Sequence, residues 1–81
     1  MEFLGDFGRK LRQTRHEKAI SQDELADRSG LHRTVISDHE LGKVDLRLSS
    51  IVKLADALDV SVSELCSDIK TREQAEREKS S

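Results

Sequence analysis

The sequence predicts an all-α fold, a compact domain of five helices. Three observations support this. The 81 residues contain no proline, the residue that most strongly interrupts helices. Apolar residues recur at intervals of three and four, as on the buried face of a helix. Two segments, SQDE and SVSE, have the capping-box pattern that begins helices. A chain of this length forms one core, so we expect one domain over residues 1–70 and a charged tail over 71–81.

The first helix is expected over about residues 3–17. Its apolar residues lie four positions apart and therefore on one side: Phe3, Phe7 and Leu11. Gly5 and Gly8 lower the intrinsic helix propensity of this segment. Packing against the rest of the domain must therefore stabilise it.

Capping residues delimit the next two helices. Ser21 begins the second, in a box where Ser21 and Glu24 satisfy each other's backbone amides. This helix extends to about Arg28, and Gly30 closes it because glycine accepts the left-handed conformation. The third helix is expected from about residue 33 to residue 41, closed by a second glycine. The expected inward-facing residues of the third helix are Val35, Ile36 and either His39 or Glu40.

A polar loop, residues 43–47, precedes the fourth helix. The apolar stripe of the fourth helix is expected to be Leu48, Ile51, Leu54, Ala55 and Leu58. The second capping box, starting at Ser61, begins a fifth helix that is expected to run through Cys66 and Ile69. Residues 71–81 contain a single apolar side chain, so this tail is expected to be either a solvated helical extension or disordered.

The composition argues against several classes of protein. With no Trp or Tyr and two Phe, we expect neither a base-stacking RNA platform nor an aromatic ligand pocket. One cysteine, Cys66, is too few for a disulfide framework or a cysteine zinc site, and we expect no metal and no cofactor. We find no glycine-rich phosphate loop or nucleophile motif, so we do not expect an enzyme. No membrane span, signal peptide or effector domain is evident, which predicts a soluble, cytoplasmic protein without a small-molecule ligand.

The charge balance constrains any role in nucleic-acid binding. Fourteen Lys and Arg against 16 Asp and Glu give a formal net charge of −2. Proteins that coat nucleic acid non-specifically are usually strongly basic. If this chain binds DNA, its positive charge must gather on one face, and binding should be selective.

Two short helices joined by a tight turn, at residues 21–40, form the outline of a helix-turn-helix. The segment SQDELADRSGLHRTVISDHELG resembles the helix-turn-helix of the lambda-repressor-like (Cro/cI, or Xre) family, and the similarity covers about residues 5–67. The small size and the LHRTVIS stretch are most similar to controller proteins of restriction–modification systems. The resemblance implies a transcriptional regulator whose third helix enters the major groove of double-stranded DNA.

The resemblance also implies which residues contact DNA. Gln22 matches a family glutamine that contacts a phosphate and braces the recognition helix. The outward positions of the recognition helix are matched by Arg33, Thr34, Ser37 and Asp38. Arg33 has the fork that binds guanine O6 and N7. Asp38 either accepts from cytosine N4, orients Arg33 or Lys43, or is a plain surface acid. Lys43 and Arg47 are expected to contact phosphate.

Other positions matching or departing from the family pattern concern the scaffold. Arg15 and Glu40 match a pair that joins the first helix to the end of the third, and we interpret them as structural. His32 stands at an N-cap where Ser, Thr, Asp or Asn is usual. His39 replaces an aliphatic residue, which predicts weaker packing beneath the recognition helix. Ala19 stands where a glycine often ends the first helix.

A homodimer on a pseudo-palindromic operator is expected, because two half-sites supply the avidity that one small module lacks. The candidate dimer seam is Val62, Leu65, Cys66 and Ile69 of the fifth helix, with the outer face of the fourth helix as a further candidate. The alternative is an antitoxin-like protein-interaction module with DNA binding secondary, since one fold serves many functions. The polar face at residues 33–38 and the lack of a long apolar tail favour DNA.

Overall fold

Five helices make up the part of the chain that the computed structural model describes, residues 2–69. In chain order they are α1 (Glu2–Glu17), α2 (Gln22–Ser29), α3 (Arg33–Glu40), α4 (Leu48–Ala57) and α5 (Val62–Leu65). Within these residues there is no strand, so the all-α prediction is confirmed. The expected tail, 71–81, lies outside the described residues. None of the described helices is long and apolar enough to cross a membrane.

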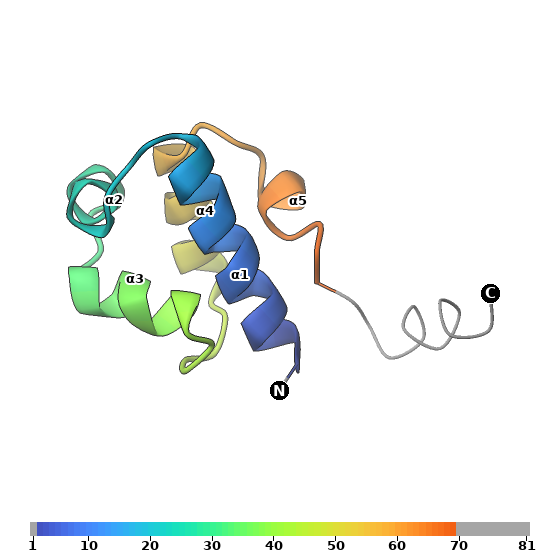
Figure 1. Cartoon of the computed structure of the whole chain (residues 1–81). Helices are drawn as coiled ribbons and strands as arrows, with labels where there is room; N and C mark the ends of the chain where they lie inside the picture. The colour runs from blue at the N-terminus through green and yellow to red at the C-terminus, as the bar shows by residue number, and fades with distance from the viewer. Residues whose placement is uncertain (1, 70–81) are drawn as a thin grey trace, which may run out of the picture.

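α1 runs through the middle of Figure 1, and α3 and α5 pack against it. In that view α2 and α3 lie on one side of α1 and α5 lies on the other. α3 packs against both α1 and α2, and α4 packs against α2 and α5. The buried apolar cluster draws on all five helices and the α1–α2 turn: Phe7, Leu11, Ile20, Leu25, Ile36, Ile51, Leu54, Ala55, Leu58 and Leu65.

The boundaries of α2 follow its capping residues. The Ser21 hydroxyl accepts a hydrogen bond from the Glu24 amide at 3.0 Å, and Gly30 closes α2 at φ 75°. The expected reciprocal contact is replaced: the Glu24 carboxylate accepts from Arg28 instead, at 3.0 Å. Ala19 takes the left-handed φ of 56°, which costs an alanine more than a glycine. Local signals therefore set where α2 starts and stops, and the turn before it carries a small conformational cost.

Two expectations about α4 and α5 are wrong. Leu48 is 71% exposed, because it is the first residue of α4 and lies beyond the part of that helix that its neighbours cover. α5 does not run through Ile69 but ends at Leu65. Beyond Leu65 the backbone hydrogen bonds join residues three positions apart. The amide of Ser67 donates to the carbonyl of Glu64, and the amide of Ile69 donates to the carbonyl of Cys66. These tight turns replace the helical pattern.

Glycine permits the close crossing of α1 and α3. A Cβ atom on Gly8 would lie 2.5 Å from the carbonyl oxygens of both His39 and Glu40, so only glycine fits there. Gly42, at φ 69°, also approaches α1, and a Cβ on it would lie 3.2 Å from the Cα of Gly5. The low helix propensity of α1 at these positions is thus compensated by direct backbone contact with the end of α3.

His39 lies on the buried side of α3, where the sequence predicted weaker packing, and its ring packs against α1. Its side chain is buried, and its ring meets that of Phe7 edge to face, with 5.9 Å between centroids. Burial lowers the pKa of His39, and the charge of Asp38 opposes this shift in part. Within residues 2–69 its Nδ1 atom has no hydrogen-bond partner. The ring therefore fills the aliphatic position as an aromatic group that favours the neutral state.

Candidate nucleic-acid interface

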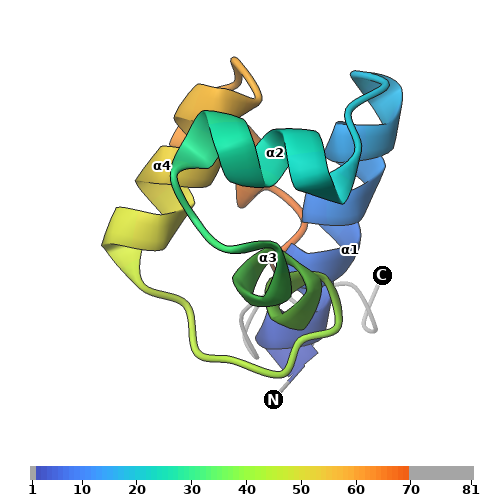
Figure 2. The ribbon, with the colours of Figure 1, turned by 90° about the vertical axis from the view of Figure 1, so that its left-hand side faces the viewer.

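The helices α2 and α3 form one face of the molecule, joined by residues 30–32. Figure 2 looks onto this face, where α2 crosses above α3 and the first turn of α3 is nearest the viewer. His32 is the N-cap residue of α3, and its side chain makes no capping hydrogen bond, as expected for a histidine at this position. The backbone amides in the first turn of α3 therefore have no side-chain acceptor at the N-cap.

Four of the predicted DNA-contacting residues lie together. They line a shallow depression of about 220 Å³: Gln22, Arg33, Thr34 and Ser37. Gln22 comes from the start of α2, and the other three come from α3. The depression therefore combines a guanidinium, a carboxamide and two hydroxyls at an exposed edge, a set of donors that suits phosphate oxygens and base edges.

A second cleft, of about 230 Å³, adjoins the first because Gln22 and Ser37 line both. It adds Arg12, an exposed residue of α1. Sequence reasoning did not select Arg12, although it lies within the stretch where the family resemblance begins. The fold thus brings a third helix and a second exposed arginine to the same surface.

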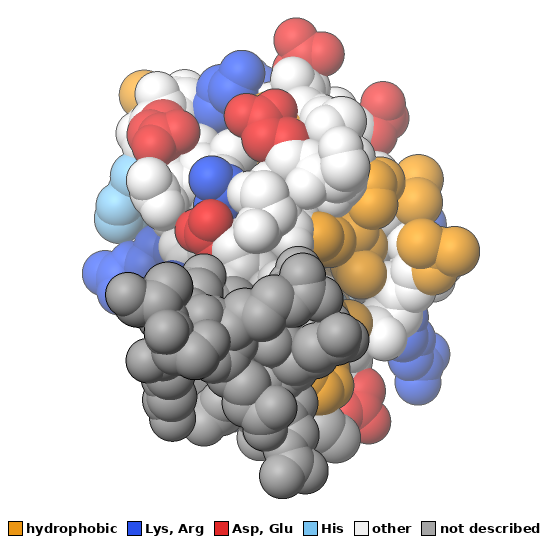
Figure 3. Space-filling model, turned by 90° about the vertical axis from the view of Figure 1, so that its right-hand side faces the viewer, with side chains coloured by type: hydrophobic (Ala, Val, Ile, Leu, Met, Phe, Trp, Pro, Cys, Tyr) orange, Lys and Arg blue, Asp and Glu red, His pale blue; other side chains and the backbone are white. Residues whose placement is uncertain are grey.

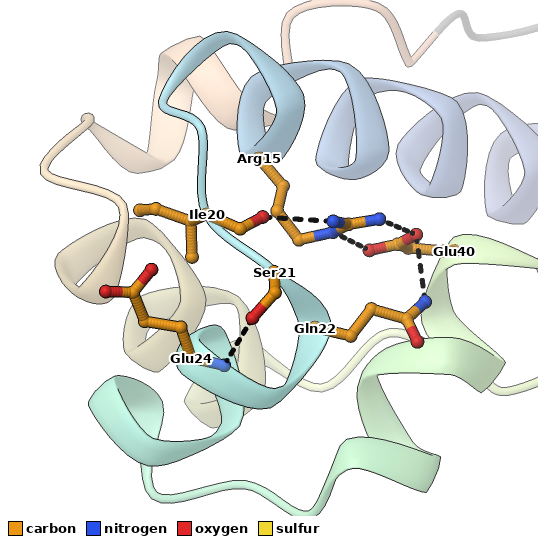
Figure 4. Close-up of polar contacts among 6 residues, drawn as sticks. All are labelled: Arg15, Ile20, Ser21, Gln22, Glu24 and Glu40. Atoms are coloured by element: carbon orange, nitrogen blue, oxygen red, sulfur yellow. Dashed lines mark hydrogen bonds and ion pairs between the residues drawn. The ribbon is translucent and has the colours of Figure 1, made fainter.

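A buried polar network fixes the positions of these helices. Arg15 donates two hydrogen bonds to the Glu40 carboxylate, at 2.7 and 3.0 Å, and a third to the carbonyl of Ile20 at 3.0 Å. The side-chain amide of Gln22 donates to the same carboxylate at 3.2 Å. Figure 4 shows Glu40 accepting from both partners. The predicted link between α1 and the end of α3 is confirmed, and Gln22 adds α2 to it.

Three predicted residues lie outside the depression. Asp38 and Arg47 line a separate cleft of about 490 Å³ between α3, the loop and the start of α4. Lys43 is exposed in the turn after α3, where its amide donates to the Asp38 carbonyl at 2.9 Å. The structure thus divides the predicted DNA-contacting residues into two groups. One surrounds Arg33, and the other lies at the end of α3 and in the loop that follows it.

Arg33 is paired with a residue that sequence analysis did not single out. Its Nε atom lies 3.4 Å from a carboxylate oxygen of Asp23, on α2. Sequence analysis named Asp38 as one candidate partner of Arg33. In the structure, the ion pair of Arg33 is with Asp23 instead. The sequence contained no signal for this pair, because the two residues are ten positions apart and meet only where α2 crosses α3.

The expected dimer seam is wrong at one residue. Leu65 is 0% exposed, since it completes the protomer's own core. Cys66 and Ile69 are partly buried against that core, and burial raises the pKa of the Cys66 thiol. The exposed apolar residues of α4 and α5 are Leu48, Val52 and Val62. Figure 3 looks onto the side that carries α5, where apolar side chains gather in a patch.

A helix braced across a second helix, with polar residues along the outer edge of the second, defines a helix-turn-helix module. The chain belongs to the Xre-type helix-turn-helix family of transcriptional regulators, since the helix-turn-helix family model matches residues 9–65. Within it, the chain is similar to the restriction–modification controllers, as the resemblance predicted.

The relatives cover most of the chain. The control protein C.BamHI of Bacillus amyloliquefaciens is 45% identical over 60 residues, 73% of this chain and 74% of that protein. The control protein C.MunI of a Mycoplasma species is 41% identical over 64 residues, 78% and 86% of the two chains. The crystal structure of the restriction–modification controller C.AhdI of Aeromonas hydrophila superposes with a TM-score of 0.78 at 42% identity, covering 80% and 98%.

Proposed function

We propose that this protein binds a pseudo-palindromic DNA operator as a homodimer and regulates transcription, with α3 in the major groove. The observation that carries the proposal is the shared depression of Gln22, Arg33, Thr34 and Ser37 at the crossing of α2 and α3. Similarity to control proteins such as C.BamHI and C.AhdI supports a restriction–modification system as the regulated target.

Each residue of the depression has a distinct task in this proposal. Arg33 presents its guanidinium to guanine O6 and N7, and Thr34 offers a methyl group to thymine. Gln22 and Arg12, which line the same cleft, bind phosphates of the DNA backbone, which sets the register without reading sequence. The amide of Gln22 has two hydrogens, so it can serve Glu40 and a phosphate together.

The test compares Arg33 with Gln22 on a set of operators. The operator is first selected from a random DNA pool, and single-base variants of it are then measured at one salt concentration. Arg33→Ala is expected to cost about 1–3 kcal/mol, with discrimination lost at one base pair per half-site. Gln22→Ala is expected to weaken all operators about equally, since phosphate contacts carry no direct sequence information.

The control is Arg28→Ala, which removes an exposed arginine of α2 whose partner is Glu24, and it should leave operator preference unchanged. A uniform loss with Arg33→Ala would make Arg33 a phosphate contact. No loss at all would remove α3 as the reading helix and support the alternative, a protein-interaction module.

The dimer is proposed to form through the exposed apolar residues of α4 and α5. Val52, at 47% exposure, lies on the outer side of α4, and Val62 is exposed on α5. Val52→Asp is expected to weaken self-association by about tenfold or more, because it places a charge in an apolar seam. Sedimentation over a concentration series measures this. Leu41→Asp alters an exposed leucine at the end of α3 and is the control; equal effects of both changes would refute the seam.

A further inference from the structure

We propose that Asp23 is a specificity-determining residue, which orients Arg33 for base reading and lowers the affinity of the protein for other DNA. This inference rests on the proposed function. The pair joins α2 to the first residue of α3, with 3.4 Å between the Arg33 Nε and an Asp23 carboxylate oxygen. It therefore acts on the side chain that is proposed to read guanine.

The geometry of the pair suits this role. Asp23 meets Arg33 through Nε, on one edge of the planar guanidinium. Among the described residues, the Arg33 side chain makes no hydrogen bond, and its closest approach to Asp23 is through Nε. Guanine takes two parallel hydrogen bonds from a guanidinium, and the terminal nitrogens supply such a pair. Asp23 thus holds one edge and leaves donors free for the base.

The pair is unsuited to a purely stabilising role. Both side chains are well exposed, at 64% for Arg33 and 74% for Asp23. An ion pair as exposed as this one contributes little to the free energy of unfolding, because water screens the two charges. An unrestrained arginine, by contrast, has a large rotamer entropy to lose on binding. The contribution of Asp23 is therefore expected in the orientation of Arg33 and not in the stability of the fold.

The position of Asp23 also disfavours indiscriminate binding. Asp23 follows Gln22, the proposed phosphate contact, at the start of α2. A carboxylate at this edge repels phosphates of any sequence, whereas an oriented Arg33 gains only at the correct base pair. Both effects widen the gap between operator and other DNA, in keeping with the net charge of −2.

The experiment uses the full chain and the selected operator, its single-base variants and an unrelated duplex. Asp23→Asn removes the charge and nearly preserves the shape. We expect affinity for the unrelated duplex to rise, and discrimination at the base pair assigned to Arg33 to fall by about threefold to fivefold, the factor an exposed ion pair supplies. In an Arg33→Ala background, Asp23→Asn should no longer change that discrimination.

Two further variants separate positioning from bulk charge and from helix stability. Asp27→Asn removes an exposed acid one turn further along α2 and should leave discrimination unchanged. Asp23→Glu keeps the charge and should retain most of the discrimination, while thermal unfolding checks that every variant is folded. Unchanged discrimination in Asp23→Asn, with wild-type protein still selecting an operator, overturns the role of Asp23 alone. Failure of the wild-type protein to select any operator overturns the proposed function itself.

Discussion

Replacing Glu40 with alanine is expected to lower the free energy of unfolding by about 3–5 kcal/mol. The Arg15 and Glu40 side chains are 10% and 4% exposed, so removing the carboxylate leaves a guanidinium buried without its counter-charge. Gln22 loses its acceptor at the same time. Since a domain of this size has only about 5–15 kcal/mol of stability, this loss removes a substantial part of the stability of the domain.

Urea unfolding of Glu40→Ala and the wild-type protein measures the loss, and operator binding should fall with the folded fraction. Glu24→Ala is the matched control, because it breaks an exposed pair with Arg28 and should cost less than about 1 kcal/mol. Replacing both buried partners, with Arg15→Met and Glu40→Leu, should recover most of the stability. A loss of 1 kcal/mol or less in Glu40→Ala would show that the network does not hold α1, α2 and α3 together.

Gly8→Ala is expected to destabilise the domain by about 3 kcal/mol, the upper end of the usual cost of overpacking. Helix propensity alone predicts the opposite, a gain of about 1 kcal/mol from removing a glycine inside α1. The new Cβ would lie 2.5 Å from two backbone carbonyl oxygens, those of His39 and Glu40, so α3 itself must move. The same displacement shifts Arg33, so operator binding by the folded protein should also weaken.

Gly5→Ala supplies a control on the same helix. A Cβ at residue 5 would meet only the flexible end of Arg9, at 3.4 Å, so this change should be neutral or stabilising. Thermal or urea unfolding of the two variants should therefore show shifts of opposite sign. Stabilisation by Gly8→Ala would mean that the crossing of α1 and α3 is looser than the structure has it.

The start and the end of α2 and the start of α5 could be predicted from the sequence because capping is a local property. The amides that Ser21 and Ser61 satisfy lie three residues away in the chain, and Gly30 closes α2 through its own φ angle. The helix-turn-helix was recognisable for the same reason, since its two short helices and glycine turn lie in one continuous segment. Periodicity likewise identified most of the core, including Phe7 and Leu54.

Periodicity could not decide which apolar side chains the fold covers. Leu48 and Leu65 both belong to apolar patterns, yet one is 71% exposed and the other 0%. The difference depends on whether another helix packs over that part of the surface. The same limit explains why Leu65 was placed in a dimer seam when it belongs to the core, and why Val52 was not singled out.

The candidate interface itself was decided only by tertiary structure. Sequence analysis identified Gln22 and Arg33, because the family resemblance names positions one at a time. It did not find Arg12, which α1 brings to the same surface, or Asp23, whose carboxylate meets Arg33 across two helices. Charge pairing depends on distances of a few ångströms between side chains remote in the chain. Those distances are set by the crossing of α1, α2 and α3, which the buried Glu40 network and the contact at Gly8 fix.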